Sequence, residues 1–323
     1  MQQLSQQRVL GATGLAVSAL GVGTNRWGGA RSTRDAQLFQ VYQAALDSGL
    51  NLFDTAEMYT KGASERELGD CLARDKRPVR LVSKFAPLPT RFSPHALMDA
   101  LDESLNRLNI ETLDLYLVHW PYTLMRIDAL MDMMALAVRI GRIRAVGVSN
   151  FSARQMRQAA ARLARYNIPL AANEVRYSLL HRQPETNGVL EACKELNVAL
   201  IAYQPLASGK LRTQAPKPAT DIALPQTRWQ EVQGRLKHLP WPGKARQEGI
   251  ARLHETLSEI ALGRGKTVSQ VALNWLLCRD EHIIPIPGST NVQHLAENID
   301  VLDWRLGDEE FAALEQASAF AKR

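Results

Sequence analysis

The sequence predicts an α/β fold of one particular kind, a closed (β/α)8 TIM barrel. Short apolar runs rich in β-forming residues recur about every thirty residues and alternate with helical segments. Eight such runs are present, a number that suits a closed parallel barrel better than an open doubly wound sheet. Because no linker divides them, we expect a single barrel domain over residues 1–323.

The beginning of the chain predicts a β-hairpin in front of the barrel. Residues 9–17 form two short apolar stretches around a Gly turn, and such a hairpin can plug the barrel floor. The first barrel strand is expected directly afterwards, over residues 19–23.

The remaining strands follow in order and are separated by helical segments. Apolar residues at helical spacing predict helices over 33–48, 94–107 and 153–165, several of them opened by a Ser or Thr in the capping position. Extra helices are expected at the C-terminal end of the chain. The strands are expected at residues 51–53, 79–83, 113–118, 143–148, 170–175, 198–202 and 282–286.

The alternation stops once, between Leu211 and Gly249. Five prolines and mixed polar residues replace the clean periodicity there, although residues 229–239 have a pattern that could form a helix. In a barrel, the loops that follow strands lie at the C-terminal mouth, where ligands bind. A lid over the site and a partly disordered insertion are both compatible with the 212–249 segment.

Composition and charge exclude several classes of protein. The 323 residues are 46% hydrophobic, and no apolar stretch approaches the roughly 18 residues of a membrane span. Lys and Arg exceed Asp and Glu by 39 to 33, but without a long basic run, so no nucleic-acid partner is expected. The polar N-terminus lacks a secretory signal pattern, and we expect a cytoplasmic protein. The three separated cysteines predict neither disulfides nor a metal site.

Polar residues directly follow three successive predicted strands. Asp54 follows the second strand, Lys84 the third and His119 the fourth, while Tyr59 lies five residues past Asp54 in the next loop. Because the carboxyl ends of barrel strands converge on one mouth, we expect these four side chains to meet there. The same mouth would receive the substrate.

These four residue types form a coherent proton-transfer set. A Tyr with a pKa near 10 is a poor proton donor at neutral pH unless a cation stabilises its phenolate, and Lys84 is the candidate cation. Asp54 can hold Lys84 by an ion pair, and His119 can donate a hydrogen bond to a substrate carbonyl oxygen that Tyr59 protonates. Taken singly, each residue also has an ordinary structural interpretation, as a turn, a surface aromatic, a solvated charge or a core histidine.

At these residues the sequence resembles the aldo-keto reductase family. The motifs are Asp54-Thr-Ala-Glu-Met-Tyr59, Ser83-Lys84 and Leu115-Tyr-Leu-Val-His-Trp-Pro121, and the match extends to Ile284-Pro-Ile-Pro-Gly-Ser-Thr-Asn291. The resemblance implies a (β/α)8 barrel that reduces aldehydes or ketones to alcohols with NADPH, or with NADH. It also implies that Asp54, Tyr59, Lys84 and His119 form the catalytic tetrad.

The resemblance further implies which residues contact the nicotinamide cofactor. They fall into three groups, one for the nicotinamide ring, one for the pyrophosphate, and one for the adenosine phosphate and adenine. The ring group is Ser149, Asn150, Glu174 and Tyr203; the pyrophosphate group is Leu206, Ser208, Gly209 and Leu211; the third group is Gly288, Ser289, Thr290, His294, Glu297 and Asn298.

The sequence departs from the family pattern in two places. Glu174 stands where the family usually has Gln, and a carboxylate accepts a hydrogen bond from the carboxamide N–H but cannot donate one to its oxygen. Thr290 and His294 occupy a segment in which relatives often carry a Lys or Arg for the 2′-phosphate of NADP. From the resemblance NADPH remains the expected cofactor, with NADH as an alternative.

Substrate and partners are less sharply predicted. Trp27, Met58, Trp120 and Tyr122 are the candidate lining of the mouth and would favour an apolar or aromatic carbonyl compound, although the two Trp side chains could equally pack the barrel rim. A small-molecule carbonyl compound is the expected partner, and the oligomeric state is not predicted. The alternative function is that of a regulatory barrel that binds the cofactor without turnover, similar to potassium-channel β-subunits.

Overall fold

The computed structural model of the chain describes residues 6–28, 32–91, 93–122, 124–212 and 244–322. Most of the long proline-rich segment, including the helix expected at residues 229–239, lies outside the described residues.

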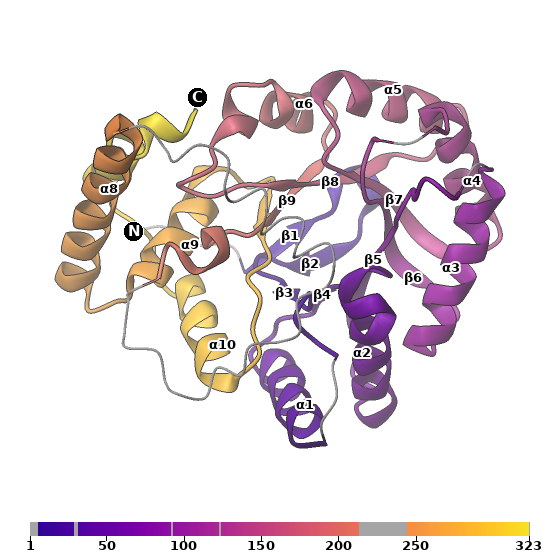
Figure 1. Cartoon of the computed structure of the whole chain (residues 1–323), viewed down its shortest axis with the longest axis horizontal. Helices are drawn as coiled ribbons and strands as arrows, with labels where there is room; N and C mark the ends of the chain where they lie inside the picture. The colour runs from indigo at the N-terminus through magenta and orange to yellow at the C-terminus, as the bar shows by residue number, and fades with distance from the viewer. Residues whose placement is uncertain (1–5, 29–31, 92, 123, 213–243, 323) are drawn as a thin grey trace.

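Eight parallel strands form a barrel at the centre of the molecule (Figure 1). The two edge strands of this sheet meet, because Gly23 bridges Gly288 and the amide of Gly21 donates to the carbonyl of Pro285 at 2.9 Å. The predicted barrel is therefore confirmed. The strands, in barrel order, are β3 (Val22–Gly23), β4 (Leu52–Asp54), β5 (Arg80–Phe85), β6 (Leu113–Val118), β7 (Ile143–Ser149), β8 (Leu170–Arg176), β9 (Ala199–Tyr203) and β10 (Ile283–Pro285).

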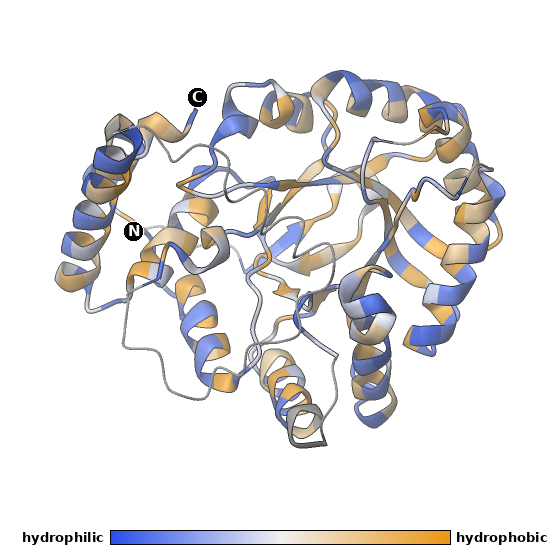
Figure 2. Ribbon diagram, viewed as in Figure 1, coloured by the Kyte–Doolittle hydropathy of each residue, from blue (hydrophilic) through white to orange (hydrophobic). Residues whose placement is uncertain are grey.

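Helices surround the strands and cover the outer face of the sheet (Figure 1). Each helix carries hydrophilic residues beside hydrophobic ones, as Figure 2 shows, and the apolar sides supply the core between helices and sheet. Ser152 and Thr267 each begin a helix with a capping box, as Ser and Thr in that position predict. The helices are α1 (Ser32–Asp47), α2 (Ala63–Arg74), α3 (His95–Leu108), α4 (Ile127–Arg139), α5 (Ala153–Ala164), α6 (Val189–Glu195), α8 (Lys244–Arg264), α9 (Val268–Arg279), α10 (Val292–Ile299) and α11 (Asp308–Ala317).

An antiparallel hairpin of β1 (Gln7–Val9) and β2 (Ala16–Ser18) precedes the barrel, as predicted. Leu10 and Val17 are fully buried and belong to the apolar cluster that fills the barrel interior. Gly11 adopts a φ of 54°, and a Cβ there would lie 2.6 Å from the carbonyl oxygen of Asn197, so only glycine fits at this contact. The hairpin thus closes one end of the barrel and leaves the other as the mouth.

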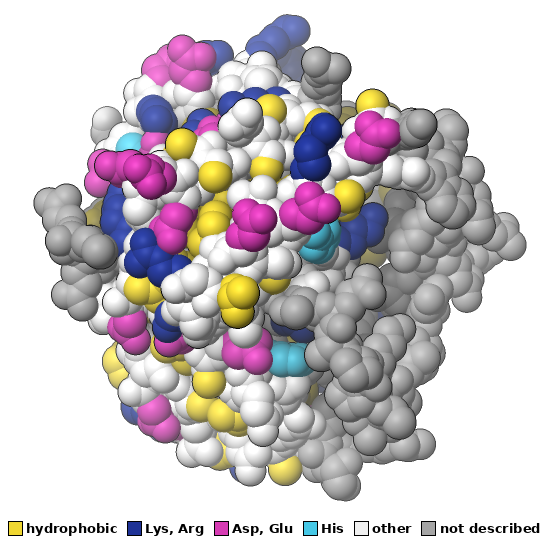
Figure 3. Space-filling model, turned by 90° about the vertical axis from the view of Figure 1, so that its left-hand side faces the viewer, with side chains coloured by type: hydrophobic (Ala, Val, Ile, Leu, Met, Phe, Trp, Pro, Cys, Tyr) yellow, Lys and Arg dark blue, Asp and Glu magenta, His cyan; other side chains and the backbone are white. Residues whose placement is uncertain are grey.

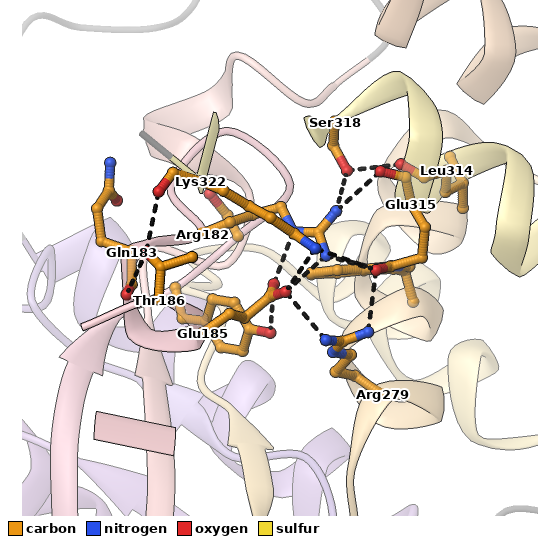
Figure 4. Close-up of polar contacts among 12 residues, drawn as sticks. Arg182, Gln183, Glu185, Thr186, Arg279, Leu314, Glu315, Ser318 and Lys322 are labelled. Carbon is orange, nitrogen blue, oxygen red and sulfur yellow. Dashed lines mark hydrogen bonds and ion pairs between the residues drawn. The ribbon is translucent and has the colours of Figure 1, made fainter. Parts of the chain in front are cut away.

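A second feature holds the C-terminal end of the chain against the barrel. Arg182 is fully buried, and its guanidinium binds both Glu185 and Glu315 at 2.6–2.7 Å (Figure 4). Arg279 and Lys322 add further cations to the same two carboxylates. We call these five residues the C-terminal cluster.

The surface carries charges of both signs. On the face that Figure 3 shows, Lys and Arg side chains lie among Asp and Glu side chains, with single hydrophobic residues between them. Within the described part of the chain, every helix is too short or too polar to cross a membrane.

Candidate active site

The centre of the mouth is the ammonium group of Lys84. The Lys84 side chain is fully buried, and its Nζ lies 2.5 Å from Asp54 Oδ1 and 3.2 Å from the Tyr59 hydroxyl. Nζ also donates to the carbonyl of Thr55 at 2.9 Å. Because β4 and β5 are parallel neighbours, Asp54 and Lys84 emerge from adjacent strand ends, and three of the four predicted tetrad residues meet here.

Hydroxyl groups hold the end of β4 in place. The Thr24 hydroxyl donates to the backbone carbonyl of Asp54 at 2.8 Å, and the Ser64 hydroxyl donates to the carbonyl of Thr24 at the same distance. Ser64 also contacts the Thr55 hydroxyl at 2.9 Å. These buried contacts fix the backbone from which the Asp54 carboxylate projects.

An ion pair fixes the loop that carries Tyr59. Glu57 accepts hydrogen bonds from the amide of Ala86 and from Arg91, whose guanidinium also donates to the carbonyl of Ala86. Thr60, with a φ of 47°, anchors the other side of the loop through its hydroxyl, which donates to the carbonyl of Trp27. Glu57 and Arg91 lie 34 positions apart and match no motif, so the sequence alone did not predict this pair.

His119 lies beside Tyr59 at the end of β6. The two rings meet edge to face with their centroids 6.0 Å apart, and the imidazole stacks on Trp120. No described group hydrogen-bonds to Nδ1 of His119. Burial and the nearby charge of Lys84 hold the pKa of His119 well below its usual value, so the imidazole is neutral.

Glu174, expected at the carboxamide, is directed toward Lys84. Its Oε2 lies 3.3 Å from Lys84 Nζ, and its side chain is 2% exposed. Apart from this ion pair, no described N–H or O–H group contacts Oε2, and the carboxyl of Asp54 lies within hydrogen-bonding reach of Glu174. Lys84 therefore faces two carboxyl groups.

The pKa directions follow from burial and from this charge arrangement. Burial favours a neutral Lys84, but Asp54 and Glu174 outweigh it and raise the pKa of the ammonium, which stays charged. Burial raises the pKa of Tyr59 despite the opposing effect of Lys84, so the phenol is fully protonated at neutral pH. Burial likewise raises the pKa of Asp54 and raises that of Glu174 further, well above the usual value.

Three residues expected at the nicotinamide lie in one connected chain. Tyr203 donates to the side-chain oxygen of Asn150 at 2.9 Å, and the Asn150 amide donates to the carbonyl of His119 and to the hydroxyl of Ser149. Ser149 in turn donates to the carbonyl of Glu174. Asn150 and Tyr203 thus present polar side chains beside the tetrad, where a carboxamide can be bound.

The loop after β9 contains the residues expected at the pyrophosphate. Ala207, Ser208 and Gly209 have successive φ values of 49°, 58° and 89°, and the amides of Ala207 and Gly209 donate to the carbonyls of Gln204 and Leu206 within the loop. Ser208 and Gly209 are exposed, while Leu206 and Leu211 are buried and anchor the two sides. The two exposed residues, Ser208 and Gly209, are therefore the part of this loop that a phosphate could reach.

The segment after β10 contains both exposed and buried residues. Gly288 and Glu297 are exposed, whereas Ser289 and Asn298 are buried and bonded to each other at 2.9 Å. Thr290 and His294 lie partly exposed beside the start of α10, which Asn291 caps.

The four candidate substrate residues are not equivalent. Trp27 is completely buried, and its indole N–H donates to the carbonyl of Ser289 at 2.9 Å. Met58 and Trp120 are partly buried near the tetrad, and Tyr122 is 82% exposed. Leu124, two positions later in the sequence, is 80% exposed.

Known proteins are similar to this one over nearly the whole chain. The model of the Aldo/keto reductase family matches residues 19–319. The chloroplastic pyridoxal reductase of Arabidopsis thaliana is 33% identical over 322 residues, which cover 94% of this chain and 84% of that protein.

Solved structures agree in fold. The glycerol dehydrogenase of Gluconobacter oxydans superposes with a TM-score of 0.81 at 27% identity, covering 98% of this chain and 96% of that one. An aldo/keto reductase from Klebsiella pneumoniae in complex with NADP and acetate superposes with a TM-score of 0.74 at 29% identity, covering 96% and 95%.

Proposed function

The chain belongs to the aldo/keto reductase family, and from this premise we propose that it is an NADPH-dependent carbonyl reductase in which Tyr59 is the proton donor. The observation that carries the proposal is the contact of Lys84 Nζ with both Asp54 Oδ1 and the Tyr59 hydroxyl at the bottom of the mouth. A buried cation at this position stabilises a phenolate as it forms.

Each tetrad residue has one task in this proposal. A reduced nicotinamide supplies the hydride. Tyr59, protonated at neutral pH, donates its proton to the substrate oxygen, and Lys84 stabilises the phenolate that remains. Neutral His119 directs an imidazole N–H toward the same oxygen, and Asp54 holds the Lys84 ammonium in position.

NADPH is proposed as the cofactor because a structural relative is solved in complex with NADP and because exposed Ser208 and Gly209 lie in the loop that the family resemblance assigns to the pyrophosphate. Thr290 and His294 replace the cations that many relatives use for the 2′-phosphate. Neutral hydrogen bonds to a phosphate are weaker than charge-assisted ones, so NADPH should be preferred over NADH by a smaller factor than in such relatives.

Aromatic aldehydes are proposed as the substrate class. Trp120, Tyr122 and Leu124 offer partly exposed or exposed apolar surface close to the tetrad. The similarity to a pyridoxal reductase makes pyridoxal the natural compound to test beside a generic aldehyde.

The experiment compares the wild type with Tyr59→Phe in the oxidation of NADPH and NADH by 4-nitrobenzaldehyde and by pyridoxal. We expect Tyr59→Phe to lose about 10²- to 10⁴-fold in kcat while it still binds NADPH. Tyr166→Phe is the matched control, because its hydroxyl contacts Asp132 on the outer helices and should not affect turnover.

Two results would overturn the proposal. Equal rates in the wild type and Tyr59→Phe would remove Tyr59 from the mechanism. Tight NADPH binding by the wild type without turnover of any aldehyde or ketone in a broad panel would identify a regulatory barrel.

A further inference from the structure

The buried cluster at the mouth contains one more carboxyl group than it has cations to balance. Lys84 Nζ lies 2.5 Å from Asp54 Oδ1 and 3.3 Å from Glu174 Oε2, and all three side chains are at most 2% exposed. The two carboxyl groups also lie within hydrogen-bonding reach of each other. With both carboxyls ionised, the three residues would carry a net negative charge out of contact with water.

The other groups that face this cluster do not supply the missing positive charge. Tyr59, from the β4–α2 loop, and Tyr203, from β9, are neutral phenols with raised pKa values, caused first by burial. His119, from β6, is neutral for the reason given above. Arg176, two residues after Glu174 on β8, is exposed to solvent, where water screens its charge.

Burying an uncompensated charge is more costly than retaining a proton. Two carboxyl groups that share one site titrate as a pair, and one of them keeps its proton far above the usual range. We propose that Glu174 is a positioning residue that shares one proton with Asp54 beside Lys84 Nζ, so that the three side chains form a unit without net charge.

The shared proton sets the electrostatic environment of Tyr59, an argument that rests on the proposed function. With Glu174 neutral, one positive charge on Lys84 and one negative charge on Asp54 face the phenol. Ionised Glu174 would add a second negative charge next to Lys84 and would raise the pKa of Tyr59 further, because both carboxylates disfavour the phenolate. Loss of the shared proton at alkaline pH should therefore slow proton donation.

The unit also gives Glu174 a hydrogen-bonding capacity that an ionised carboxylate lacks. A protonated carboxyl has one O–H donor and one carbonyl acceptor, the same pair of functions as the side-chain amide of Gln. Glu174 thus replaces the Gln that the family usually has at this position with a residue of similar shape. While Glu174 holds its proton, its polarity is also similar to that of Gln.

The first test measures stability in the cofactor-free protein and needs no turnover. A carboxyl whose pKa is raised by folding destabilises the native state progressively as pH rises above its unfolded value near 4.5, up to its folded pKa. Glu174→Gln removes this titration. We expect the Tm of Glu174→Gln to exceed that of the wild type by a margin that grows by about 5 °C between about pH 5 and about pH 8.

Glu65→Gln is the matched control, since Glu65 is also fully buried but pairs with its own cation. Its carboxylate accepts hydrogen bonds from Arg107 and Ser83 at 2.6 Å. Glu65→Gln should lower the Tm at about pH 8, because it leaves the Arg107 charge with a weaker partner. A Glu174→Gln protein that loses stability in the same way would show that Glu174 is an ordinary ionised partner of Lys84, and would overturn the proposal.

The second test follows kcat with the best aldehyde across pH. We expect the ratio of the Glu174→Gln rate to the wild-type rate to rise at alkaline pH, since the variant cannot acquire the second negative charge. A ratio independent of pH, together with a Tm difference independent of pH, would show that no proton is shared. An active Tyr59→Phe protein would overturn the proposed function alone, because the Tm test does not depend on catalysis.

Discussion

The mouth cluster of Asp54, Lys84 and Glu174 and the C-terminal cluster are both ion-pair networks around a buried cation, but they are built in opposite ways. In the C-terminal cluster three cations surround two carboxylates, and the guanidinium of Arg182 binds both carboxylates through several hydrogen bonds (Figure 4). In the mouth cluster one cation faces two carboxyls, and Glu174 Oε2 has no described partner besides Lys84 Nζ.

The difference in design indicates different roles, with the C-terminal cluster stabilising the fold and the mouth cluster supporting proton transfer. In the C-terminal cluster the excess positive charge lies on partly exposed Arg279 and Lys322, which water can solvate, and the paired groups stabilise the packing of the segments that contribute to it. In the mouth cluster the excess carboxyl is almost completely buried, an arrangement that is costly, and groups with strongly shifted pKa values gather where proton transfer occurs. Substitutions in the mouth cluster should therefore change kcat, and substitutions in the C-terminal cluster should change stability.

The largest effect is expected from Lys84→Met. This change removes the cation that stabilises the Tyr59 phenolate, and kcat should fall by at least about 10²-fold. The fold should survive, because Asp54 and Glu174 can both take up protons. Turnover and far-UV circular dichroism measure the two outcomes, and a Lys84→Met protein with wild-type kcat would remove the distinction between the clusters.

An intermediate effect is expected from Glu185→Gln in the C-terminal cluster. Burial alone would raise the pKa of Glu185, but Arg182 and Arg279 hold it below the usual value. Such a group stabilises the fold above its unfolded pKa, and this contribution is lost as pH falls through its folded pKa.

Glu185→Gln should therefore cost about 2–3 kcal/mol near pH 7, with little effect on kcat. The cost should shrink below about pH 4, the opposite of the pH dependence expected for Glu174→Gln. Urea unfolding at the two pH values checks both statements, and a cost that is the same at both would contradict the ionised state of Glu185.

The smallest effect is expected from Tyr177→Phe. Tyr177 is buried, and its hydroxyl donates to Glu185 at 2.9 Å, so its loss removes a single hydrogen bond worth about 1 kcal/mol. Compared with Tyr59→Phe, the same chemical change should lower stability and leave turnover intact. A fall in kcat for folded Tyr177→Phe would show that the C-terminal cluster communicates with the mouth.

The sequence predicted the barrel and the meeting of the tetrad because both follow from local patterns. Strand β6 begins and ends at the predicted residues, and the expected helix at 153–165 ends within one residue of α5. Asp54, Lys84 and His119 could be placed together because the ends of parallel strands share one rim.

Contacts across the barrel could not be predicted in this way. The alternation of side chains along β8 places Glu174 on the same face as Ala172, which is directed inward. Whether its carboxyl then reaches Lys84, three strands away in the sheet, depends on the barrel radius and the rotamer. The burial of Trp27 and the Glu57–Arg91 pair likewise depend on contacts between distant segments.

The seam of the barrel has a consequence for protein synthesis. The strands that meet there come from opposite ends of the chain, and the Trp27 indole binds a carbonyl 262 positions later. During synthesis on a ribosome, both edges of the sheet remain unpaired until nearly all of the polypeptide has emerged. A chain that stops before β10 cannot close the seam, and its open edge strands are templates for aggregation with other nascent chains.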